Sequence, residues 1–63
     1  MNYGDQIKLT AFGGEEITRR VIVAENGTVY VCKEAEYQSA IRENREPVCV
    51  GFPMESIIEE VNE

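Results

Sequence analysis

The sequence predicts an α+β domain, mainly β: a strongly bent antiparallel sheet of four or five strands, with one short helix between strands 3 and 4. Three observations support this class. The dipeptide Asn26-Gly27 separates two β-branched runs, an apolar pattern of period two precedes them, and a stripe of helical period follows. Asn-Gly favours a type I′ hairpin, because both central residues of that turn need positive φ.

The hairpin is predicted from Ile17–Ala24 and Thr28–Cys32. With a two-residue loop the expected pairs are Glu25 with Thr28, Val23 with Tyr30, and Val21 with Cys32. Both faces of this hairpin are apolar near its centre, which predicts that both are covered. A closed barrel, or a sheet with a helix laid over it, would provide that cover.

The first strand is expected from Gln6 to Ala11, where apolar and polar residues alternate. Gly13-Gly14 marks the turn that follows. Two loops are compatible with it, and the three-residue loop that includes Glu15 aligns more apolar residues. It pairs Ile7, Leu9 and Ala11 with Val21, Arg19 and Ile17, whereas the two-residue loop pairs them with Arg20, Thr18 and Glu16.

A helix is expected between Lys33 and Asn44. Its apolar stripe, completed by Asn44, consists of Tyr37, Ala40 and Ile41. Acidic residues lie near its start and Arg42 near its end, as the helix dipole favours. Pro47 is expected to end it, because the residue before a proline avoids helical angles.

The fourth strand is predicted over residues 48–52, with Val48, Val50 and Phe52 on one face. Residues 53–61 fit two forms. Their apolar spacing matches a helix, but a 3₁₀ turn feeding a strand from Ile57 to Val61 is equally compatible. The turn and strand are preferred, because a fifth strand would close the sheet and cover an edge.

The resulting order is three strands, a helix, a strand, a 3₁₀ turn and a last strand. This order is similar to that of the small SH3-like barrels, with a helix in place of the loop between strands 3 and 4. The resemblance implies a fold, either a small SH3-like barrel or the bent sheet, and assigns no functional residue.

The chain of 63 residues has room for one domain, residues 1–63. A domain of this size buries little apolar surface, which makes association with a second copy favourable. The net charge of −6 disfavours contact with nucleic acid or an anionic membrane. Two roles for the acidic charge are considered: it keeps such a domain soluble, or it serves to dock the domain on a basic partner.

Two cysteines, Cys32 and Cys49, are fewer than small secreted folds usually carry. No signal peptide or membrane span is recognisable, so the cytoplasm is the expected location, with both thiols reduced. The cysteines are expected to be buried apolar residues, with a disulfide as the alternative. A metal site is not expected, because two thiolates form half of a zinc shell.

Catalysis is not expected, because the chain has no histidine to activate its hydroxyl groups. No cofactor is expected either, since Gly13-Gly14 lacks the lysine and the spacing of a phosphate loop. Arginine and aromatic side chains are typical anchors at protein interfaces. The candidate binding residues are therefore Arg19, Arg20, Tyr30, Tyr37, Arg42 and Phe52.

The sequence is thus interpreted as a non-catalytic interaction module that binds a protein partner or its own copy. Two alternatives remain open. One is an acidic inhibitor or nucleic-acid mimic that docks on a basic partner, and the other is a small barrel that binds nucleic acid.

Overall fold

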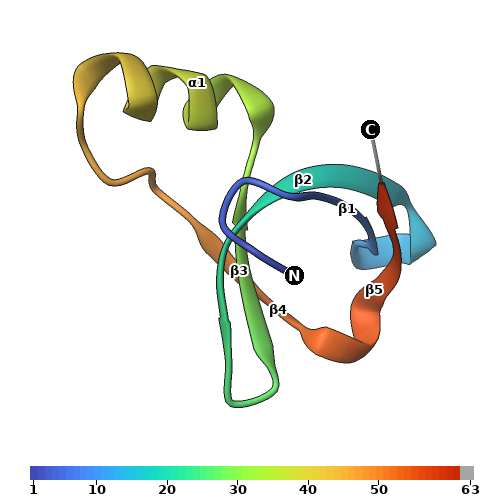
Figure 1. Ribbon diagram of the computed structural model, residues 1–63. Helices are drawn as coiled ribbons and strands as arrows, with labels where there is room; N and C mark the ends of the chain where they lie inside the picture. The colour runs from blue at the N-terminus through green and yellow to red at the C-terminus, as the bar shows by residue number, and fades with distance from the viewer. Residues whose placement is uncertain (62–63) are drawn as a thin grey trace.

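The computed structural model describes residues 1–61 of the chain. Five strands, one α-helix and two 3₁₀ turns follow one another along it (Figure 1). In chain order these are β1 (Gln6–Thr10), η1 (Phe12–Gly14), β2 (Glu16–Glu25), β3 (Thr28–Cys32), α1 (Glu34–Glu43), β4 (Val50–Pro53), η2 (Met54–Ser56) and β5 (Ile57–Val61). The element order expected from the sequence is confirmed, including the helix between strands 3 and 4.

The five strands form one antiparallel sheet in the order β4-β3-β2-β1-β5. β2 is twice as long as its neighbours and bends, so that its first half pairs with β1 and its second half with β3 (Figure 1). β4 and β5 are the edges, and no ladder joins them within the described residues. Of the two forms that the sequence predicts, the structure shows the bent open sheet.

The hairpin turn is confirmed. Asn26 and Gly27 have φ of 51° and 77°, as a type I′ turn requires. The expected pairs hold from Glu25 to Val23, but the ladder then shifts between Val21 and Val23. Val21 therefore lies opposite Val31, and its predicted pairing with Cys32 is wrong. A β-bulge inserts one extra residue in β2 and turns Val21 toward the core.

The two faces of the hairpin differ in burial. On the inner face Val21, Val29 and Val31 are at most 1% exposed. On the outer face Tyr30 is half-buried and Val23 is 42% exposed. The prediction that both faces are covered is wrong for the outer face, because α1 lies across one end of the sheet instead of over it (Figure 1).

The core lies inside the bend of β2 and draws on both halves of the sheet. Its fully buried members are Ile7, Leu9, Val21, Val29 and Val31, against which Ile17, Phe52, Met54 and Ile57 pack. Burial of such side chains stabilises a fold by about 1.5–3 kcal/mol each. Few residues therefore supply most of the stabilisation of this small domain.

Both predicted registers for the first turn are wrong. The ladder pairs Leu9 with Ile17 and ends with Thr10 opposite Glu16, so the connection is five residues long. Within it the N–H of Ala11 donates to the carbonyl of Glu15 at 2.7 Å, and η1 fills the space between. This register is favoured because it places the two apolar residues Leu9 and Ile17 together in the core.

The helix is confirmed, although it ends before Pro47. Its last residue is Glu43, and the C-cap residue Asn44 adopts the left-handed conformation with φ of 56°. The predicted apolar stripe is only partly buried, since Ala40 is 1% exposed but Ile41 is 55% exposed. Within residues 1–61 no helical segment has both the length and the apolar character needed to cross a bilayer.

The last segment adopts the turn and strand, and the alternative helix is wrong. η2 leads directly into β5, which pairs with β1. The expectation that this strand would close the sheet is also wrong, because β5 extends one edge and leaves β4 as the other. β4 begins at Val50 and not at Val48, since its ladder with β3 begins where Val50 meets Val31.

Val21→Ala should lower the free energy of unfolding by about 2 kcal/mol, because it leaves a cavity in the core. Val48→Ala removes the same two methyl groups from a side chain that is 74% exposed, and it should change stability by less than about 0.5 kcal/mol. Urea denaturation of both variants measures the difference. Equal losses would show that Val21 contributes no more to the core than an exposed valine does.

Candidate functional site

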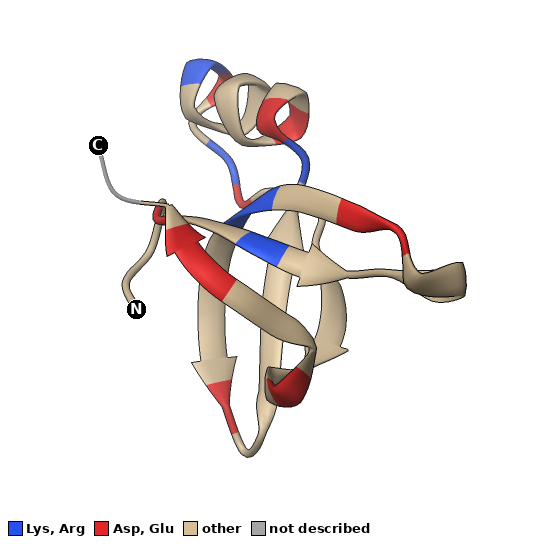
Figure 2. Ribbon diagram, turned by 90° about the vertical axis from the view of Figure 1, so that its right-hand side faces the viewer, with Lys and Arg blue, Asp and Glu red and all other residues tan. Residues whose placement is uncertain are grey.

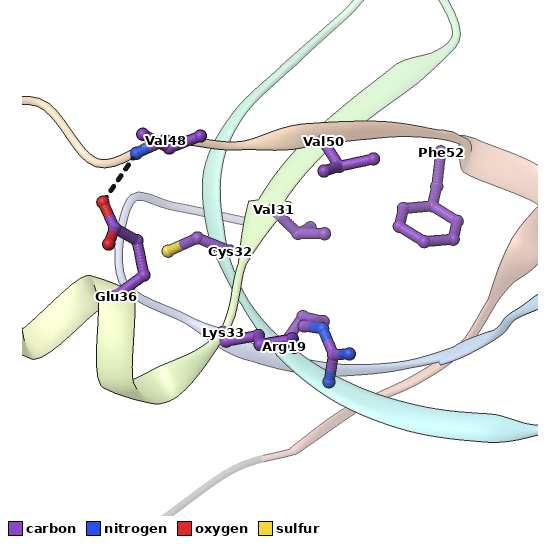
Figure 3. A pocket seen from close by; sticks show the side chains of 8 residues that line it. All are labelled: Arg19, Val31, Cys32, Lys33, Glu36, Val48, Val50 and Phe52. Atoms are coloured by element: carbon purple, nitrogen blue, oxygen red, sulfur yellow. Dashed lines mark hydrogen bonds between the residues drawn. The ribbon is translucent and has the colours of Figure 1, made fainter.

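A groove runs along β4 on the inner side of the sheet (Figure 3). Its volume is about 360 Å³. We call it the β4 groove; its lining residues are Arg19, Val31, Cys32, Lys33, Glu36, Val48, Val50 and Phe52. Figure 3 shows Val48, Val50 and Phe52 in a row along one wall, with Val31 and Cys32 between that wall and Arg19.

The apolar wall exists because β4 is an edge strand. Alternation directs Val48, Val50 and Phe52 to the same side. Phe52 packs against the core, whereas Val50 is 61% and Val48 is 74% exposed, because no strand pairs with the outer edge of β4 in the described sheet. Phe12 in η1 is fully exposed and, with Phe52, lines a second hollow farther along β4. A contiguous apolar surface of this kind is typical of interaction sites.

Two cations lie at the rim of the β4 groove. Arg19 pairs with Ile7 across β1 and β2 and so belongs to the inner face, while its guanidinium extends outward (Figure 3). Lys33 directly precedes α1. Within the described chain, neither Arg19 nor Lys33 forms a salt bridge. Their charges are therefore available to a bound group.

Glu36, the acidic residue of the groove, is already engaged. Its Oε2 accepts a hydrogen bond from Nη1 of Arg45 at 2.7 Å. It accepts another from the backbone N–H of Val48 at 2.9 Å, drawn as a dashed line in Figure 3. These bonds, that of Arg45 first, lower the pKa of the Glu36 carboxyl below its ordinary value of 4.5. They also fasten the segment between α1 and β4 to the helix.

Cys32 is the nucleophilic side chain nearest the groove. It is 4% exposed, and burial followed by the charge of Glu36 raises the pKa of its thiol. The protonated thiol is a weak nucleophile, because the thiolate is the reactive form. The chemistry that this groove supports best is therefore apolar contact with a charged end.

A second polar cluster joins α1, β2 and the N-terminal segment. Nε of Arg20 donates to Glu34 at 2.6 Å, and Nη1 donates to the carbonyl of Gly4 at 2.7 Å. The same guanidinium lies 5.0 Å from the ring centroid of Tyr37, whose ring contacts that of Tyr3. These bonds hold the helix on the end of the sheet, and the cluster has a structural role.

The candidate binding residues do not form one site. Arg19 and Phe52 line the β4 groove, but Arg20 and Tyr37 belong to the structural cluster. Tyr30 packs over Gly51 on the outer face, and Arg42 lies on the exposed side of α1. In the sequence, the alternation of residues 48, 50 and 52 indicates the apolar wall of the β4 groove. No sequence pattern indicates that Lys33 and Glu36 line the same groove.

Among residues 1–61 no three His, Cys, Asp or Glu side chains lie close enough together to hold a metal ion. No protein-family model, curated protein or solved structure matches the chain. The β4 groove is therefore interpreted from its own residues.

Glu36→Gln should reduce the loss of stability in acid. A carboxyl whose folded-state pKa lies below 4.5 stabilises the protein above that pH, and the contribution disappears as the pH falls through the folded value. The wild type should therefore lose stability below about pH 4.5, and the variant should lose less. Urea unfolding at a series of pH values measures this. Glu55→Gln, in η2, is the control. If Glu36→Gln lost as much stability in acid as the wild type, the prediction would be contradicted.

Proposed function

We propose that this domain is a non-catalytic protein-binding module that takes up an extended, acidic segment of a partner protein along the free edge of β4. One observation carries the proposal: an unpaired strand edge adjoins an apolar groove with two cations at its rim. A peptide that adds to a sheet edge gains backbone hydrogen bonds, and pockets beside the edge select its side chains.

The backbone of β4 supports this mode of binding. The N–H of Met54 donates to the carbonyl of Gly27 at 2.9 Å, in the register that pairs Phe52 with Val29. In an antiparallel ladder such inward bonds recur at every second residue. The polar backbone groups of Gly51 therefore point away from β3, toward the open side. Pro53 contributes a carbonyl there and no donor.

The side chains beside this edge suit an apolar ligand. Val48 and Val50 are the most exposed apolar residues of the wall, and buried Val31 forms the floor. Successive residues of an extended peptide point to opposite sides, so every second residue would enter the groove. We therefore expect a partner segment with alternating apolar residues.

The charge at the rim favours an acidic partner. Arg45 neutralises Glu36 at 2.7 Å, which leaves Arg19 and Lys33 as the available charges of the groove. The chain as a whole carries −6, but salt screens charges farther away than about 8 Å at physiological ionic strength. A carboxylate bound in the groove would be attracted by the two nearby cations.

A second copy of the chain suits this edge less well. A symmetric dimer places the same patch of each chain against the other. That patch offers two cations but no free carboxylate to bind them, because its acidic residue, Glu36, already pairs with Arg45. Self-association through β4 is accordingly one outcome of the test below and not the proposal.

The alternative of a nucleic-acid mimic loses its support, because it needs a clustered negative face. Figure 2 shows acidic residues on several parts of the sheet and on the helix, with basic residues between them. They occur at both ends of β2, in α1, in η2 and in β5.

The absence of histidine from the sequence and the raised pKa of Cys32 support a non-catalytic role. We also propose that the domain works in the cytoplasm, where disulfides are rare and, when present, usually transient. The two free cysteines of a chain this short support that location.

Val50→Asp should weaken the binding of peptides selected on the wild-type domain from a random library by at least about tenfold, because it places a charge in the apolar wall. Ile58→Asp, on the opposite edge strand and 44% exposed, should bind them normally. Isothermal titration calorimetry measures both affinities. Loss in Ile58→Asp with retention in Val50→Asp would overturn the site. A wild-type dimer that Val50→Asp dissociates would replace the partner by a second copy.

Arg19→Gln should lower the affinity for the same peptides about threefold to tenfold, because it removes one cation from the rim of the groove. It should also reduce the salt dependence of binding. Arg42→Gln, on the exposed side of α1, is the matched control and should change neither. If acidic peptides are not enriched, or if both variants behave alike, the charge preference is refuted.

A further inference from the structure

Continuing the β3–β4 register by one position places the two cysteines opposite each other at the end of the ladder. Cys32 is the last residue of β3, and Cys49 directly precedes β4. The ladder pairs Val31 with Val50, and the next position in the same register places Cys32 opposite Cys49. Both are free thiols in this structure, Cys32 buried and Cys49 half-buried.

The position is of the type in which side chains approach most closely. The inward bond from Met54 to Gly27 makes every second pair hydrogen-bonded, up to Val31 with Val50. In the extended register Cys32 and Cys49 take the position of a non-hydrogen-bonded pair, a type in which Cα atoms are about 4.5 Å apart. Disulfides form across Cα separations of about 4.4–6.8 Å.

The segment that carries Cys49 is held in place from α1. Glu36 accepts the backbone N–H of Val48 at 2.9 Å, and Pro47 is buried. Cys49 is also among the groups whose charge raises the pKa of Cys32, as expected of neighbouring sulfurs. Two thiols kept close by the surrounding structure form a bond without a large backbone movement.

We propose that Cys32 and Cys49 are a reversible dithiol–disulfide pair that cross-links the end of β3 to the start of β4. The oxidant is a small disulfide such as oxidised glutathione. The half-buried Cys49 loses its proton and attacks one glutathione sulfur, which releases one glutathione thiolate and leaves a mixed disulfide. Cys32 then loses its proton and attacks Sγ of Cys49, which releases the second glutathione thiolate.

The order of these steps follows from exposure. Cys32 is 4% exposed and its pKa is raised, so it reacts only with a sulfur already brought beside it. The second step should accelerate as the pH rises, because more of Cys32 becomes thiolate.

The cross-link would enclose α1 in a covalent loop and fix one wall of the β4 groove, since Cys32 lines the groove and Cys49 lies between Val48 and Val50. This effect on the groove rests on the proposed function. The bond itself does not, and peptide binding is measured separately from it.

The full chain, incubated with oxidised glutathione and then quenched with acid, should become lighter by two hydrogen atoms. Digestion without reductant should yield one linked peptide that contains both cysteines. The melting temperature should rise by about 10 °C and return when dithiothreitol is added, since closing a loop of this length stabilises a domain. Cys49→Ser, at the half-buried position, should show neither the linked peptide nor the rise.

Glutathione adducts alone, or dimers linked between chains, would overturn the proposal, because they would show that the two sulfurs do not meet. A linked peptide without any change in melting temperature would refute the cross-link between β3 and β4 as a constraint. Loss of peptide binding in Val50→Asp is independent of either result.

Discussion

The bend of β2 is the constraint on which the rest of the structure depends. One strand pairs with β1 over its first half and with β3 over its second half, and the bulge beside Val21 lies in the second. Because of that bulge Val21 faces inward and completes a core with Leu9 from β1 and Val29 from β3. A straight β2 would place these residues on one flat sheet with no opposite layer to cover them.

The same bend leaves the sheet open, and the open side creates the candidate site. β5 pairs with β1, so β4 remains an edge, and its apolar side chains border the core without being enclosed by it. In a domain this small, completing the core and presenting a binding surface draw on the same few apolar residues. Phe52 shows both roles, since it packs on the core and also lines the β4 groove.

Polar contacts position the elements around the groove. Arg20 fastens the start of α1 and the N-terminal segment to β2, while Glu36 fastens the segment after α1 to the helix. Both contacts are hydrogen bonds to carboxylates in the first turn of α1, so this turn is fastened to the sheet and to the segment that leads into β4. This arrangement engages Arg20, Arg45 and Glu36 within the fold and leaves Arg19 and Lys33 at the rim.

Local chemistry by itself determined the strands, the helix and the Asn26-Gly27 turn, because positive φ, period-two alternation and helical spacing are properties of neighbouring residues. Only the tertiary structure decided the bulge beside Val21, the register of the first turn and the edge to which β5 adds, since each depends on which distant side chains share the core. The separation of Arg19 from Arg20 followed from strand alternation. That Arg19, Lys33, Glu36 and Val48 line one groove did not follow from the sequence, because it requires the bend of β2 and the path of the chain after α1.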